Sequence, residues 1–124
     1  MMSKMRALAA GLVLLLAACS SASPQERAQA AELAVLAPLK QTYNGVIMGF
    51  DFPPGANADT TLIVSLDIQN YIGMDDAAAA AMKRNVLAQW RTAWIAAHPH
   101  QHATITVRMI DFVGRKLVEE SAKV

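Results

Sequence analysis

The chain has 124 residues, of which 54% are hydrophobic, and its 11 Lys and Arg against 10 Asp and Glu give a formal net charge of +1. This length indicates one domain rather than two. The near balance of charge lacks the basic excess of nucleic-acid-binding domains, so we expect no nucleic-acid partner. A single cysteine excludes a disulfide within the chain.

The amino-terminal segment has the organisation of an export signal. Lys4 and Arg6 precede an unbroken apolar run over residues 7–16. The run is shorter than the roughly 20 apolar residues that a transmembrane helix needs. A charged start, a short apolar stretch and small residues at its end are typical of a secretory signal peptide.

The segment Leu16-Ala17-Ala18-Cys19 follows that run and resembles the lipobox of bacterial lipoproteins. The resemblance covers residues 1 to about 23. It implies that a lipid is attached to the Cys19 thiol, that the chain is cut just before this residue, and that the new amino terminus is acylated. A plain signal peptide cut near Ala18, or an uncleaved anchor helix, is the alternative.

The resemblance also implies a destination. The residue after the lipidated cysteine is Ser20 rather than Asp, which implies the periplasmic face of the outer membrane. We therefore expect a cleaved signal peptide over 1–18, a lipidated tether over 19–23 and one domain over 24–124. The mature chain would have 106 residues, with nine basic and ten acidic side chains.

The domain is predicted to begin with a short helix. Ser23 can cap it, Pro24 suits its first position and Glu26 completes a capping box. We expect this helix to end near Ala37, because Pro38 disfavours helical geometry in the residue before it. A small hairpin between residues 39–43 and the next segment is an alternative for the following turn.

Two strands should come next. Residues 46–52 follow a turn signal at Asn44-Gly45 and alternate in polarity. Residues 60–72 give the clearest strand pattern in the chain. The side chains expected on the core face are Val46, Met48, Phe50 and Phe52 in the first strand, and Leu62, Val64, Leu66 and Ile68 in the second.

A long helix over residues 76–97 follows, with Asp75 as its cap. One apolar stripe runs along it at spacings of three and four. The stripe contains Met82, Val86, Trp90, Ala93, Trp94 and Ala97. The two tryptophans could form a ligand-stacking pair, but their place in the stripe favours core packing.

The remaining chain predicts two more strands. Residues 103–112 place Ile105, Val107 and Met109 on one face, Val113-Gly114 form a turn, and residues 116–122 form an edge strand. The predicted fold is an α+β two-layer sandwich. Its four-stranded, largely antiparallel sheet is covered by one long helix, with a short N-terminal helix added.

The second face of this sheet is mixed in polarity. It should carry Ile63, Ser65, Asp67, Thr104, Thr106, Arg108 and Ile110. Either the first helix partly covers this face or a partner docks there. We take four of these residues as the candidate partner surface: Ile63, Asp67, Arg108 and Ile110.

The function expected is a non-catalytic binding or scaffolding domain that serves an envelope assembly or transport system through an envelope protein partner. The sequence contains no G-x-S-x-G nucleophile motif and no phosphate-binding loop. Asp51 and Asp111 near strand ends are better explained as turn-forming residues than as catalytic ones. We therefore expect no enzyme activity and no cofactor.

Metal binding is the alternative function, through His98, His100 and His102. In an extended segment these alternate side chains would lie on one side, and three imidazoles can bind zinc, copper or nickel. No carboxylate in the motif orients the rings, and a histidine followed by Pro99 also fits the end of a helix. We expect only weak, adventitious metal binding.

Overall fold

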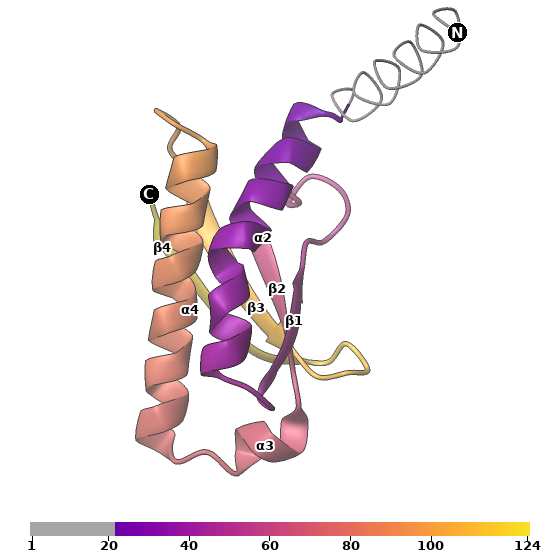
Figure 1. Ribbon diagram of the computed structural model, residues 1–124, viewed down its shortest axis with the longest axis vertical. Coiled ribbons are helices and arrows are strands. Elements are labelled where there is room, and N and C mark those ends of the chain that lie inside the picture. The colour runs from indigo at the N-terminus through magenta and orange to yellow at the C-terminus, as the bar shows by residue number, and fades with distance from the viewer. Residues whose placement is uncertain (1–21) are drawn as a thin grey trace, which may run out of the picture.

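The computed structural model describes residues 22–124, so the predicted signal peptide and Cys19 lie outside the described residues (Figure 1). Three helices and four strands follow one another in this part of the chain. In order they are α2 (Pro24–Thr42), β1 (Ile47–Asp51), β2 (Thr61–Leu66), α3 (Ile68–Ile72), α4 (Asp76–Ala97), β3 (Thr104–Ile110) and β4 (Lys116–Lys123).

The four strands form one mixed sheet in the order β1-β2-β3-β4. The two outer pairs are antiparallel, but β2 and β3 are parallel. The prediction of a largely antiparallel sheet is therefore wrong at its centre. The reason is the crossover through α3 and α4, which returns the chain to the end of the sheet where β2 began.

Both long helices cover the same face of the sheet, where α2 and α4 lie side by side (Figure 1). They bury one hydrophobic core against the strands. Its members include Leu36 and Leu39 from α2, Met82, Val86, Trp90, Ala93 and Trp94 from α4, and Leu62, Val64, Leu66, Ile105, Val107 and Met109 from the sheet. The predicted fold had one long helix over the sheet, whereas the structure has two, α2 and α4.

The first helix is longer than predicted. Ser23 caps it by accepting a hydrogen bond from the Glu26 N–H at 3.1 Å, as expected. It then continues through Pro38 to Thr42 over 19 residues, which also excludes the hairpin alternative for residues 39–43. Leu36 and Leu39 are buried on either side of Pro38. Their burial offsets the roughly 3 kcal/mol that a proline costs inside a helix.

The second strand is shorter than predicted. It ends at Leu66, and Asp67 caps α3 by accepting a hydrogen bond from the Asn70 N–H at 3.0 Å. Aspartate side chains compete in this way with strand pairing. The Asn70 side chain then donates to the Gly45 carbonyl at 2.7 Å, which ties α3 to the turn before β1.

The first strand contains a bulge that changes which side chains are buried. The register with β2 shifts between Ile47 and Gly49. A bulge adds one residue and so reverses the alternation on one side of it. Ile47 is buried, whereas Met48, predicted for the core face, is 53% exposed.

The second half of the domain agrees with its sequence pattern. The predicted bounds of α4 are those found, and Asp75 caps it by accepting from the Ala78 N–H at 2.7 Å. Trp90 and Trp94 are buried, and Ile105, Val107 and Met109 form the core face of β3. Of the helices within residues 22–124, none is long and apolar enough to span a bilayer.

Candidate functional site

The sheet face opposite the helices is the broadest candidate surface, and we refer to it as the open face. Within residues 22–124 neither long helix covers it, and α3 lies beyond the end of β2 (Figure 1). The strand register places these side chains on it: Asp51, Ile63, Ser65, Thr104, Thr106, Arg108, Ile110, Glu119 and Ser121. The alternative that the first helix covers this face is therefore wrong.

The open face is organised in cross-strand rows. Asp51, Ile63, Arg108 and Glu119 are successive partners across the four strands. The Arg108 Nε donates to Glu119 Oε2 at 2.8 Å, and this hydrogen bond lowers the pKa of Glu119. The next row joins the Thr106 and Ser121 hydroxyls at 2.9 Å. Arg108, Glu119, Thr106 and Ser121 are thus already paired within the protein.

Three of the four residues predicted for the partner surface share the open face. Ile63 is the direct partner of Arg108, and Ile110 pairs with Ser65 in the next row along. Asp67 is not among them, because it caps α3 past the end of β2. The surface therefore consists of two isoleucines beside an ion pair.

The turn between β3 and β4 lies at one end of this face and is built around Asp111. This side chain is only 1% exposed and accepts hydrogen bonds from the N–H groups of Val113 at 3.1 Å and Arg115 at 2.9 Å. The Arg115 Nε donates to its second oxygen at 2.8 Å. Burial alone would raise the pKa of Asp111, but the bonds from Arg115 and Val113 outweigh it and lower the pKa.

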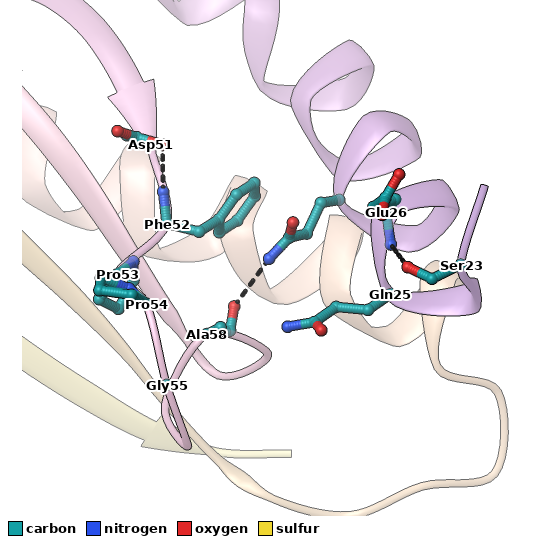
Figure 2. Close-up of a pocket in the computed structure, with 10 residues that line it drawn as sticks. Ser23, Gln25, Glu26, Asp51, Phe52, Pro53, Pro54, Gly55 and Ala58 are labelled. Atoms are coloured by element: carbon teal, nitrogen blue, oxygen red, sulfur yellow. Dashed lines mark hydrogen bonds between the residues drawn. The ribbon is translucent and has the colours of Figure 1, made fainter.

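A polar cleft of about 510 Å³ lies at the opposite end of the molecule, between the start of α2 and the loop after β1 (Figure 2). Its lining includes Ser23, Gln25, Glu26, Asp51 and residues 52–55. The Ser23 hydroxyl is engaged in the helix cap, and the Asp51 carboxylate accepts from the Phe52 N–H at 2.8 Å. Both groups thus serve as acceptors for backbone N–H groups at the edge of the cleft.

A buried carboxyl group that the sequence analysis missed lies between the two long helices. Glu32 on α2 is 1% exposed, and neither of its carboxylate oxygens has a hydrogen-bond partner. Its Oε1 is 3.7 Å from Nδ1 of His98. Desolvation, followed by repulsion from Asp59, raises the pKa of Glu32 to about 7.

The spacing along α2 could have revealed this residue. Glu32 follows Ala28 by four positions and precedes Leu36 by four, so it lies on the stripe that the helix buries. Because Glu32 is shielded from solvent, it has no direct access to a substrate. A buried acid whose pKa is raised on folding instead makes the stability of the fold depend on pH.

The three histidines do not form the extended row on which the metal hypothesis depended. His98 ends α4 and stacks on Trp94, with ring centroids 4.4 Å apart. A turn follows, in which the Gln101 N–H donates to the His98 carbonyl at 3.2 Å and His100 has a φ of 66°. His102 is exposed, and its Nδ1 lies 3.3 Å from the Val124 carbonyl.

No metal-binding arrangement of three or more His, Cys, Asp or Glu side chains exists in the part of the chain that the structure describes. Trp90 is fully buried and Trp94 is 2% exposed, with its Nε1 donating to the Asp59 carbonyl at 2.7 Å. This confirms that the tryptophan pair is part of the core. Comparison of the chain with protein families, curated proteins and solved structures found no match.

Proposed function

We propose that the protein is a non-catalytic binding domain that is anchored by a lipid on Cys19 to the periplasmic face of the outer membrane. There it would hold an envelope protein partner on its open face, as an accessory part of an assembly or transport system. The observation that carries this proposal is a sheet face left uncovered by both long helices.

The composition of the open face fits a partner that binds and dissociates. Ile63 and Ile110 are only partly exposed, and the Arg108–Glu119 ion pair and the Thr106–Ser121 hydrogen bond lie close to them in the register. Non-obligate interfaces have this mixed polarity, with a small apolar centre inside a polar rim. The partner expected is a protein surface of the same mixed character.

The surroundings of the two most buried acids support a non-catalytic domain. Asp111 is fully engaged in the turn between β3 and β4, and Glu32 is enclosed between α2 and α4. A general acid or base must come within hydrogen-bond reach of its substrate. Asp111 stabilises the turn instead, and Glu32 is enclosed without a hydrogen-bond partner.

The anchor is tested by the intact mass of the protein isolated from membranes. We expect a chain that begins at Cys19 and carries added acyl mass, because the lipobox resemblance implies both. The variant Cys19→Ala should be released or misprocessed while its melting temperature in detergent is unchanged. A mature chain that starts elsewhere and carries no acyl mass would refute the anchor.

The binding surface is tested by a matched pair of substitutions. Ile63→Gln changes the open face, and Leu33→Gln makes the same type of change on the exposed side of α2, where Leu33 is 36% exposed. Chemical cross-linking of cells should give a defined partner product with the wild type and with Leu33→Gln, and lose it with Ile63→Gln. Equal products from the two variants would place the partner elsewhere.

A further inference from the structure

The turn between β3 and β4 presents two apolar side chains to solvent. Phe112 is 86% exposed and Val113 is 60% exposed. Phe112 is the most exposed large hydrophobic residue in the part of the chain that the structure describes. A chain of this size buries such side chains where it can, so an adjacent pair at a turn points to a surface contact.

This turn is held in one conformation by its own hydrogen bonds. The Gly114 N–H donates to the Asp111 carbonyl, and the Asp111 N–H donates to the Arg115 carbonyl, each at 3.0 Å. Gly114 has a φ of +87°, a region in which glycine is favoured. Together with the contacts of the Asp111 carboxylate, these bonds order the tip before any contact forms. Little conformational entropy is then lost on binding.

Two cations follow the apolar pair directly. The Arg115 side chain is 77% exposed and Lys116 is exposed. Asp111, the acid of the turn, is buried and forms an ion pair with the Arg115 Nε, so the exposed tip carries two apolar side chains and a net positive charge from Lys116. Side chains of this kind suit the membrane interface, where apolar groups enter the acyl boundary and cations meet lipid phosphates.

We infer that Phe112–Lys116 is a second membrane contact, which inserts Phe112 and Val113 into the bilayer that holds the lipid on Cys19. This inference rests on the proposed anchor. A protein–protein interface typically buries ~1,200–2,000 Å² in total, which a two-residue tip does not supply. A weak membrane contact is sufficient when a lipid already holds the chain at the surface, because the second contact is then intramolecular.

The arrangement of the domain allows both contacts with one bilayer. The start of α2 and the turn between β3 and β4 lie near opposite ends of the molecule, and this turn belongs to the edge of the sheet opposite β1 (Figure 1). The 19 residues of α2 span about 28 Å between these ends. The inferred contact at the tip would therefore lie about one helix length from the point where the domain begins, along the same bilayer surface.

The test uses the full, membrane-anchored chain with a tryptophan at the tip. Phe112→Trp keeps an aromatic side chain there, and Gln89→Trp places the same reporter at an exposed position in the middle of α4. Each is reconstituted in vesicles of phosphatidylethanolamine and phosphatidylglycerol with brominated acyl chains. Trp90 and Trp94 are buried in both variants, so the wild type supplies the background emission.

The expected result is that brominated chains quench the tryptophan of Phe112→Trp and that acrylamide does not reach it. Gln89→Trp should show the reverse, and adding Val113→Ser to Phe112→Trp should reduce the quenching by lipid. Equal lipid quenching of both reporters overturns the inference. The inference is also overturned if the protection of the tip tryptophan from acrylamide increases with the amount of protein per vesicle at a constant lipid concentration. Such a dependence would indicate contact with another protein molecule.

Failure of the anchor is visible separately, as the absence of acyl mass on Cys19. If the mass is absent, the same two reporters are compared after adding the chain to the vesicles. If brominated lipid quenches the two reporters equally, the inferred contact is wrong, whether or not Cys19 carries a lipid.

Discussion

The two faces of the sheet are made by alternate residues of the same strands, yet they differ in almost every physical respect. In β3, Ile105, Val107 and Met109 are at most 2% exposed beneath the helices, whereas Thr106 and Arg108 between them remain partly exposed. The covered face lowers the free energy of the folded state, and the open face leaves its side chains in contact with solvent. Substitutions on the covered face should therefore lower stability, whereas substitutions on the open face should leave stability nearly unchanged and test the proposed binding.

The covered side contains one exception to its apolar character. Glu32 is as buried as Asp111, but Asp111 accepts three hydrogen bonds and Glu32 accepts none. The pKa of Asp111 is lowered, while that of Glu32 is raised to about 7. Two equally buried carboxyl groups thus have pKa values shifted in opposite directions, because hydrogen-bond donors surround only Asp111.

The largest effect is expected in the centre of the covered face. Trp90→Ala should destabilise the domain by roughly 3–5 kcal/mol, because it removes a fully buried ring that packs against Phe52 with centroids 5.9 Å apart. Ile95→Ala on the same helix is the control, since Ile95 is 47% exposed. Chemical denaturation measures both. Similar losses from the two variants would contradict the distinction between covered and exposed positions.

The second prediction concerns Glu32 and pH. Its pKa rises from 4.5 to about 7 in the folded protein, so folding is favoured while the group is protonated in the native state. This contribution is fully present below about pH 4.5 and is lost as the pH rises through about 7. The loss should be on the order of 3 kcal/mol.

Glu32→Gln keeps the shape of the side chain and removes its charge. The variant should lose this component of the pH dependence and unfold at higher denaturant concentration than the wild type at pH 8. Denaturation curves between pH 4 and pH 8 provide the measurement. An unchanged pH slope in Glu32→Gln would show that another group controls it.

Much of the covered face could be predicted from periodicity. The stripe of α4 and the alternation of β3 both locate core residues correctly, because each pattern continues without interruption through its element. The errors occur where a local hydrogen bond or a packing contact overrides the pattern. Asp67 stops β2 by capping α3, and the buried Leu36 and Leu39 carry α2 through Pro38.

The residues that β2 and β3 contribute to the open face were largely predicted, but those of β1 and β4 were not. Ile63, Arg108 and Ile110 fall on it because strand alternation is reliable within β2 and β3. The pairing of Arg108 with Glu119 depends on the register of β4, whose own alternation is weak. The exposure of Phe112 depends on the turn around Asp111, which no periodic pattern encodes.

The smallest effect is expected on the open face, where two neighbouring residues of β3 allow a reciprocal test. Thr106→Val removes a hydroxyl that pairs with Ser121 at 2.9 Å, while keeping a β-branched side chain that suits a strand. Ser121 is exposed, so water can replace the lost partner. The change in the free energy of unfolding should be within about 0.5 kcal/mol.

Val107→Thr makes the opposite exchange one residue further along, on the covered face. Val107 is 2% exposed, so the new hydroxyl would be buried among apolar side chains at a cost of about 1–3 kcal/mol. Because the two variants exchange the same two residue types at adjacent positions, strand propensity nearly cancels between them. Their difference in chemical denaturation then measures the contrast between the faces, and equal losses of stability from both would remove the energetic distinction on which the proposed binding face depends.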